Sequence, residues 1–204
     1  MNKYKTILDI SKKGITSLKD YFEKNPCPPQ LTSLFCDNNE LTSLEGCPQH
    51  LTKLMCSCNK LKSLKGCPPN LTTLYCSDNQ LTSLKGCPPN LTTLYCYNNP
   101  LKSLLWCPEK LKSFNCNENN LKSFKNFPIP LSSSYISYSW KDNPFVEGSN
   151  SMNEICTMII KRKFSAKNNI YFSNKVSKIN HDTCFGALFN DKIKTSVTLF
   201  TLLI

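Results

Sequence analysis

The sequence is poor in arginine and in long apolar stretches. Of the 25 basic side chains only Arg162 is an arginine, so the formal net charge of +11 rests on lysine. Because arginine is the usual side chain for bidentate contacts with bases and phosphates, this charge is a weak signal for sequence-specific nucleic-acid recognition. The longest apolar run, Val197–Ile204, is interrupted by threonines, and no apolar segment follows the N-terminal residues. We therefore expect no membrane-spanning helix and no secretory signal peptide.

The short motifs that hold metals or phosphates are also missing. No two cysteines have the C-x-x-C spacing of a zinc site, and the six glycines are scattered rather than grouped in a phosphate-binding loop. We expect neither a metal nor another cofactor. The chain has 13 cysteines, an odd number without an export signal, which favours free thiols in a reducing intracellular compartment.

One short repeat with a constant period organises the rest of the sequence. The string from Ser63 to Cys76 occurs again, unchanged, from Ser83 to Cys96. Related blocks follow the pattern L-x-x-L-x-C-x-x-N-x-L-x-x-L-x-x-C-P-x-x, and they begin at Leu31, Leu51, Leu71, Leu91 and Leu111. Leucine-rich repeats have periods of about 20–29 residues, and these blocks have a period at the short end of that range. The self-similarity therefore indicates a leucine-rich-repeat solenoid, in which each block is one coil.

The alternation within a block predicts the path of each coil. In the first regular block Leu34 and Cys36 should point inward and Phe35 outward, as in a short strand, and successive strands should form a parallel sheet on the concave side. The prolines after the second cysteine exclude a helix and favour an extended convex side. Asparagine amides can bond both the turn after each strand and the adjacent coil. This predicted ladder comprises Asn39, Asn59, Asn79, Asn99 and Asn119.

These blocks resemble the short leucine-rich repeats of bacterial type III effectors of the YopM and IpaH kind, with Cys36 and its equivalents at the family's valine position. They also resemble the cysteine- and asparagine-rich repeat proteins of amoeba-infecting giant viruses. The resemblance covers Leu31–Ser134, about half of the chain. It implies a solenoid that serves as a binding scaffold, viral or effector-like, in a host cytoplasm.

The N-terminal part departs from the regular blocks. Residues 1–30 are predicted to form a cap with a degenerate first repeat, in which Leu8 and Ile10 match a strand and Lys13 stands where asparagine belongs. Six extra residues around Tyr21–Asn25 should bulge from this coil. Atypical terminal repeats are expected of caps.

The C-terminal part departs as well. Residues 31–144 hold five regular blocks and a degenerate last one, whose strand is predicted from Leu131, Ser134 and Ile136, with Ser139 in place of the asparagine; this makes seven strands in all. Residues 145–204 are predicted to be a small α/β C-terminal cap or appendage, with a helix near 152–163 and strand-like segments. A frame-disrupted remnant is the other interpretation of this segment.

A catalytic cysteine is the enzyme alternative. IpaH-type effectors carry a ubiquitin-ligase domain behind their repeats, but its C-x-D motif is absent here and the segment 145–204 is too short to hold it. Cys184 and His181 are three residues apart, yet a Cys–His nucleophile also needs an orienting third group. We expect no enzymatic activity; the alternative is a thiol-dependent ubiquitin-transfer enzyme that uses Cys184.

The variable outward positions of the strands carry the candidate binding surface. We call the outer, concave surface of the predicted sheet the sheet face. Its outward row is apolar and aromatic. Residues of these types are enriched in protein interfaces, and exposed patches of this kind usually contact another macromolecule. The predicted partner-binding residues are Phe35, Met55, Tyr75, Tyr95, Tyr97 and Tyr135, with Asn115 interrupting the row. The competing interpretation is that these side chains only stack on one another as cross-strand pairs.

A row of lysines follows the asparagine ladder along the flank of the repeats. It comprises Lys62, Lys65, Lys85, Lys102, Lys122 and Lys125. We interpret it as a solvated face, with nucleic-acid or anionic-surface binding as the alternative. The function predicted from the sequence is therefore a monomeric protein–protein interaction scaffold or adaptor whose unidentified protein partner lies on the sheet face.

Overall fold

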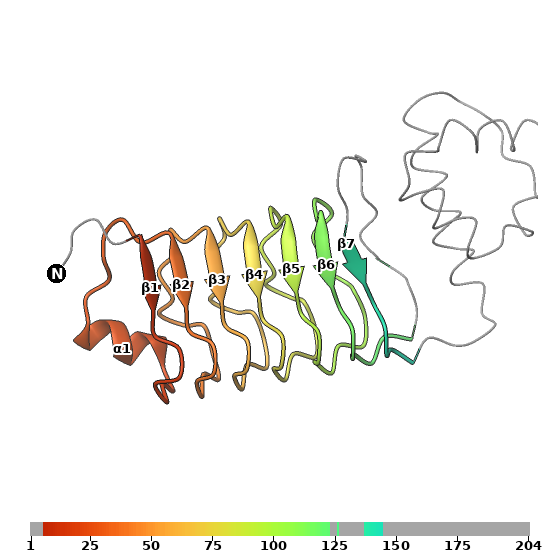
Figure 1. Cartoon of the computed structure of the whole chain (residues 1–204), viewed down its shortest axis with the longest axis horizontal. Helices are drawn as coiled ribbons and strands as arrows, with labels where there is room; N and C mark the ends of the chain where they lie inside the picture. The colour runs from red at the N-terminus through yellow and green to blue at the C-terminus, as the bar shows by residue number, and fades with distance from the viewer. Residues whose placement is uncertain (1–5, 123–125, 127–136, 145–204) are drawn as a thin grey trace, which may run out of the picture. The chain divides into compact units, whose positions relative to one another are not determined.

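The computed structural model of this chain describes residues 6–122, 126 and 137–144. Seven short strands pair in parallel and in chain order, from β1 to β7, and one helix precedes β2 (Figure 1). The elements are β1 (Ile7–Asp9), α1 (Leu18–Lys24), β2 (Ser33–Phe35), β3 (Lys53–Met55), β4 (Thr73–Tyr75), β5 (Thr93–Tyr95), β6 (Ser113–Asn115) and β7 (Ser137–Ser139). This arrangement confirms the predicted solenoid with a parallel sheet.

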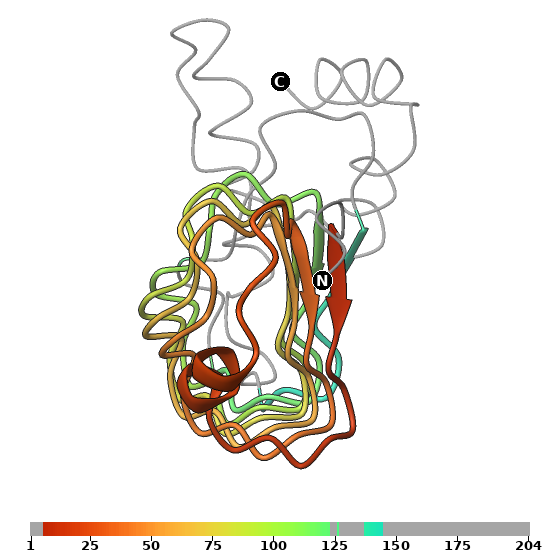
Figure 2. The same ribbon diagram turned by 90° about the vertical axis from the view of Figure 1, so that its left-hand side faces the viewer.

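The core lies between the strands and the opposite side of the coils, which Figure 2 shows end-on. Leu34 and Cys36 are fully buried while Phe35 is partly exposed, and the same alternation recurs in every strand from β2 to β6. Residues 26–122 contain turns but no helix on the convex side. Each of the coils that contain β2 to β5 buries four leucines, as Leu31, Leu34, Leu41 and Leu44 show, together with the cysteine that follows its strand, and this burial supplies its hydrophobic stabilisation.

The degenerate first repeat takes the predicted place. Leu8 pairs with Leu34, so β1 continues the sheet in register. The extra residues form α1, whose start is capped by the Ser17 hydroxyl, which accepts a hydrogen bond from the Asp20 N–H at 3.2 Å. The helix backbone packs closely against the corner at Gly46, where an added Cβ would lie 2.5 Å from the Lys19 Cα.

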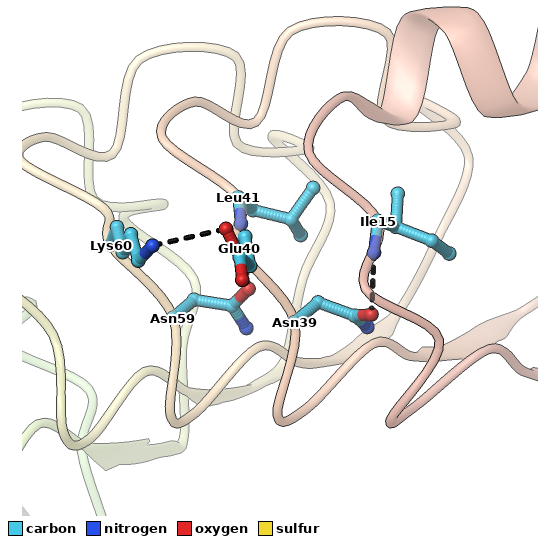
Figure 3. Close-up of polar contacts among 6 residues, drawn as sticks. All are labelled: Ile15, Asn39, Glu40, Leu41, Asn59 and Lys60. Carbon is cyan, nitrogen blue, oxygen red and sulfur yellow. Dashed lines mark hydrogen bonds and ion pairs between the residues drawn. The ribbon is translucent and has the colours of Figure 1, made fainter.

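Buried asparagine amides join each coil to the one before it. The Asn59 amide donates to the Cys36 carbonyl of the preceding coil at 3.0 Å and to the Cys56 carbonyl of its own coil at 3.1 Å. Its side-chain oxygen accepts from the Leu41 N–H at 3.0 Å, also in the preceding coil. Figure 3 shows the equivalent bond from the Ile15 N–H to the Asn39 oxygen, at 2.9 Å. Equivalent bonds form at the other predicted members of the ladder, Asn39, Asn79, Asn99 and Asn119.

A second ladder runs where the chain enters the strands. The Thr52 hydroxyl donates to the Thr32 carbonyl of the preceding coil at 3.3 Å, and the Thr72 hydroxyl donates to the Thr52 carbonyl at 3.2 Å. The series ends at Lys112, which takes the threonine position of the next coil. Side-chain bonds to the preceding coil are thereby present at both ends of β2, β3, β4 and β5.

The last strand does not lie where the repeat count places it. The prediction from Leu131, Ser134 and Ile136 is wrong: the strand is β7 (Ser137–Ser139), and its register pairs Tyr138 with Phe114. Asn143, and not Ser139, occupies the ladder position: its amide donates to the Cys116 carbonyl at 2.9 Å, and its oxygen accepts from the Leu121 N–H at 3.1 Å.

The physical reason for this shift is the reach of the ladder amide. A serine hydroxyl is too short to bond carbonyl and N–H groups of two coils at once, so the strand is placed by the next asparagine with the correct spacing. The residues from Ser137 to Pro144 read S-Y-S-W-K-D-N-P and match T-L-Y-C-Y-N-N-P from Thr93 to Pro100.

The connection before β7 is longer than the connections in the regular blocks. Asn143 bonds a carbonyl that lies 27 positions earlier in the chain, whereas the equivalent bond of Asn119 spans 23 positions. The difference, 27 minus 23, means that this connection holds four additional residues. The register of the ladder is kept although the loop is longer.

The remaining C-terminal predictions fall on residues that the structure does not describe. These are the cap or appendage at 145–204 and its helix near 152–163, together with Cys184 and His181. Within the described residues, no helix has the length and apolar character needed to cross a bilayer.

Replacing one ladder asparagine should destabilise the solenoid far more than replacing a convex one. Asn79→Ala leaves the Leu61 N–H and the Cys56 carbonyl without their side-chain partner, which should lower the free energy of unfolding by about 1–3 kcal/mol. Asn70→Ala, at an exposed convex position, is the matched control and should change it by less than about 0.5 kcal/mol. Urea unfolding followed by circular dichroism measures both. Equal effects of the two variants would contradict the ladder.

Candidate functional site

The sheet face presents a row of outward side chains with one residue from each strand. The pairing register aligns Asp9, Phe35, Met55, Tyr75, Tyr95, Asn115 and Ser139. Four consecutive strands, β2 to β5, therefore contribute an apolar or aromatic residue, and all four side chains are partly exposed. Tyr135 lies outside the described residues, and the position predicted for it belongs to Ser139. The row is thus bounded by polar residues at both ends.

Two tyrosines of this row pack against one another. The rings of Tyr75 and Tyr95 are stacked, with centres 4.8 Å apart and an interplanar angle of 19°. The Ser113 hydroxyl of β6 donates to the Tyr95 hydroxyl at 3.1 Å. Tyr75 and Tyr95 therefore do form a cross-strand stacked pair, and the stacking fixes the two rings while leaving part of each exposed.

Lys53 belongs to the same surface, although the repeat pattern did not single it out. Its ammonium nitrogen lies 5.4 Å from the ring centre of Phe35 and 5.9 Å from that of Tyr75, within the range of a cation–π contact. Lys53 is two residues before Met55, so it points to the same side of the strand. That two-residue spacing was the available signal, since the outward row at Ser33, Thr73 and Thr93 is otherwise small and polar.

The turns after the strands add a polar margin to the sheet face. Asp37 accepts a hydrogen bond from the Ser57 N–H at 2.8 Å; burial raises the pKa of the Asp37 carboxyl, an effect that this hydrogen bond opposes. Tyr97 lies beside the aromatic row, and burial together with the nearby Asp78 carboxylate raises the pKa of its hydroxyl. The margin is therefore acidic close to Phe35 and aromatic close to Tyr95.

The inward cysteines are packing residues and do not form a reactive site. The Cys56 thiol is fully buried and donates to the Tyr75 carbonyl of the next coil at 3.3 Å. Burial, with smaller contributions from neighbouring thiols, raises the pKa of Cys56 well above its ordinary value. A thiol held protonated in this way is a poor nucleophile and a poor metal ligand. In the described part of the chain, no three His, Cys, Asp or Glu side chains are grouped to hold a metal ion.

The lysine row is solvent-exposed along the convex flank. Its described members are Lys62, Lys65, Lys85, Lys102 and Lys122, and Lys125 lies outside the described residues. Lys60, which is not a member, forms an ion pair with Glu40 of the preceding coil at 3.0 Å (Figure 3). The row thus occupies a different side of the coil from the sheet face.

Comparison with known proteins supports the same architecture. The family model for leucine-rich repeats (two copies) matches residues 69–105. The fold is a leucine-rich-repeat solenoid. No curated protein matches the chain. The leucine-rich-repeat domain of a Shigella effector is 25% identical, with 80% of this chain and 78% of that chain covered and a TM-score of 0.56.

Two further solved structures are similar to this chain. An internalin (inlF) from Listeria monocytogenes is 18% identical over 73% of this chain and 44% of that chain, with a TM-score of 0.59. YopM from Yersinia enterocolitica is 28% identical over 57% of this chain and 30% of that chain, with a TM-score of 0.43. The chain spans less than half the length of these two proteins. The Shigella domain, of which most is covered, confirms the predicted resemblance to effector repeats.

Two cysteines of one coil should differ sharply in their reaction with a thiol reagent. Cys56 is fully buried and Cys58 is exposed. Because they are two residues apart, both lie in the same coil and in the same proteolytic fragment. Maleimide labelling of the native protein, read by mass spectrometry, should modify Cys58 at least about a hundredfold faster, because Cys56 reacts only after local unfolding. In the denatured, unreduced protein we expect close to 13 reactive thiols. Equal native rates, or a denatured count near one, would contradict free, packed thiols.

The fold should lose stability in alkali. Burial raises the pKa of Cys67 to about 12 and that of Cys76 well above its ordinary value of 9.0. Above 9.0 the unfolded chain releases thiol protons that the folded chain keeps, so alkali favours unfolding by about 1.4 kcal/mol per pH unit for each buried thiol. The urea midpoint measured between about pH 8 and about pH 11 should fall steeply. Cys76→Val should reduce the slope, and an unchanged slope would refute this assignment.

Proposed function

We propose that this chain is a protein-binding scaffold that holds one protein partner on the sheet face. The observation that carries the proposal is the row Phe35, Met55, Tyr75 and Tyr95, which stays partly exposed on four consecutive strands of one sheet. Aromatic residues and methionine are enriched in protein interfaces. The row is long enough to contact an extended segment or a helix of the partner.

The arrangement limits the entropy that the protein loses on binding. The stacking of Tyr75 on Tyr95 and the position of Lys53 between Phe35 and Tyr75 hold these side chains in place before a partner arrives. Fewer rotatable bonds are then immobilised in the complex, which favours affinity. Asp9 at one end and Asn115 at the other supply polar contacts at the rim.

The role that fits this surface is that of an effector-like adaptor without catalytic activity, acting in the reducing cytoplasm of a host cell. The likeness to the Shigella effector domain supports the adaptor role. The eleven described cysteines are free, and the inward ones pack as apolar residues, which suits a reducing compartment. Burial keeps inward thiols such as Cys56 protonated, which suits packing rather than nucleophilic attack.

Binding of nucleic acid along the lysine row is the second candidate function. The exposed lysines and the net charge of +11 favour it. An interaction of this kind rests on neutralised phosphates, so its affinity falls steeply as salt rises, whereas an apolar interface changes little. This difference separates the two functions experimentally.

The test compares two variant surfaces in an affinity pull-down from host lysate, with and without nuclease. Tyr75→Asn with Tyr95→Asn places in β4 and β5 the residue that β6 already carries as Asn115, so the strands keep a compatible side chain. This double variant should weaken partner binding by about 30-fold for each aromatic side chain removed, because an aromatic anchor of an interface contributes about 2 kcal/mol or more. Retained binding would refute the proposal.

The matched control is Lys62→Glu with Lys102→Glu, which reverses two charges of the lysine row. Under the proposed function this variant keeps the partner, and moderate salt and nuclease change nothing. If it loses the partner instead, and nuclease or salt abolishes capture by the unaltered protein, the nucleic-acid function is correct. Circular dichroism melts of all variants confirm that each still folds.

A further inference from the structure

One corner of the convex side breaks the pattern of its neighbours. The corresponding corners end in Glu45-Gly46, Lys65-Gly66 and Lys85-Gly86, but the next coil has Leu105-Trp106. The Leu105 and Trp106 side chains are 51% and 59% exposed, and only Ile7, on the sheet face, joins them among the large apolar side chains exposed in the described residues. We call them the Leu105–Trp106 pair.

The backbone at this corner forms the same turn as in the preceding coils, although Trp106 stands in place of their glycine. The Cys107 N–H donates to the Leu104 carbonyl at 2.9 Å, as Cys87 does to Leu84, which closes the same four-residue turn. Trp106 sits at φ 72° and Gly86 at φ 89°, so the tryptophan adopts a left-handed conformation that L side chains with a Cβ disfavour. Other turns also hold non-glycine residues with positive φ, such as Cys58 and Glu118, so the feature that sets this corner apart is the large, exposed apolar side chain at a position where glycine would be less strained.

The surroundings of the pair are basic. Lys65 and Lys85 hold the position of Leu105 in the two preceding coils, and neighbouring coils of a parallel sheet are about 4.8 Å apart. Lys102 and Lys110 flank the pair within its own coil and are exposed, and Glu109 is the acidic residue of this corner. In the described residues, Lys65 and Lys85 have no ion-pair partner.

We propose that the Leu105–Trp106 pair and its lysines form a docking site for the surface of an anionic lipid bilayer. The indole ring and the leucine insert at the headgroup boundary, and the lysine ammonium groups contact acidic headgroups. Figure 1 shows the coils stacked in chain order. Lys65, Lys85 and Leu105 hold equivalent positions in three successive coils, so they follow one edge of the solenoid. This edge differs from the sheet face, so a protein partner and a membrane can be bound at the same time.

An acidic protein is the other surface that positive charge attracts, but the geometry favours lipid. The pair forms a protruding corner at a turn, and a protein partner would need a matching pocket to bury it. A fluid headgroup layer accommodates a protruding indole without a preformed pocket. Lysine, as a compact point charge, matches mobile headgroups better than it matches the paired geometry of a carboxylate clamp.

The experiment measures binding of the full chain to vesicles by co-sedimentation. Vesicles of phosphatidylcholine alone are compared with vesicles of phosphatidylcholine mixed with phosphatidylserine. The deciding variant is Leu105→Lys with Trp106→Gly, which recreates the Lys85-Gly86 corner and adds a positive charge. We expect binding only to the mixed vesicles, and a loss of about tenfold or more in the variant despite its extra charge. The variant should melt at the same temperature as the unaltered protein or higher, because the left-handed strain is removed.

Tryptophan fluorescence gives an independent reading. The emission lost between the unaltered protein and the variant belongs to Trp106, and it should shift to shorter wavelength when mixed vesicles are added. Lys65→Glu with Lys85→Glu should weaken binding to the mixed vesicles and make that binding less dependent on salt. Tyr75→Asn with Tyr95→Asn, on the sheet face, should leave vesicle binding unchanged.

Two results would overturn the proposal. One is that the unaltered chain does not sediment with mixed vesicles, and the other is that the Leu105→Lys, Trp106→Gly variant binds them as tightly. Capture of an acidic protein through the pair without vesicle binding would assign the corner to a protein partner instead.

Discussion

The buried side-chain amide of asparagine is the interaction on which this fold depends. Each coil has to turn after a strand of only 3 residues, which leaves carbonyl and N–H groups pointing into the interior. The Asn59 amide bonds such groups in two coils at once, and the same geometry recurs down the stack. Each unmade bond would leave a buried polar group without a partner. The spacing of asparagines therefore decides where every strand can lie.

This constraint explains which parts of the fold follow from the sequence. The regular spacing of Leu8 and Ile10 predicts the first coil although Lys13 replaces the asparagine. In the structure this coil is bonded by Asn39 of the next block. Counting one period forward misplaces the last strand because the connection before it is longer, whereas the position of Asn143 marks where the strand lies. A connecting loop can change its length with little energetic penalty to the stack, but the ladder amide cannot change its distance from the strand.

The candidate surfaces also have features that follow from the sequence and features that only the structure shows. The row from Phe35 to Tyr95 could be predicted because strand side chains alternate between two sides. The contacts of Lys53 with two rings depend on rotamers of a long side chain, which the repeat pattern does not specify. The replacement of glycine by Trp106 is visible in the sequence, but only the backbone conformation shows that the turn stays left-handed and carries strain.

The direction of the two ladders bears on how the chain is made. The ladder asparagine and the entrance threonine of a coil both bond atoms of the coil before it, as Asn79 does with Cys56 and Thr72 with Thr52. During synthesis those atoms have already left the ribosome when the new coil emerges. Each coil therefore finds its template in place, and the solenoid can lengthen coil by coil from the N-terminal end as translation proceeds.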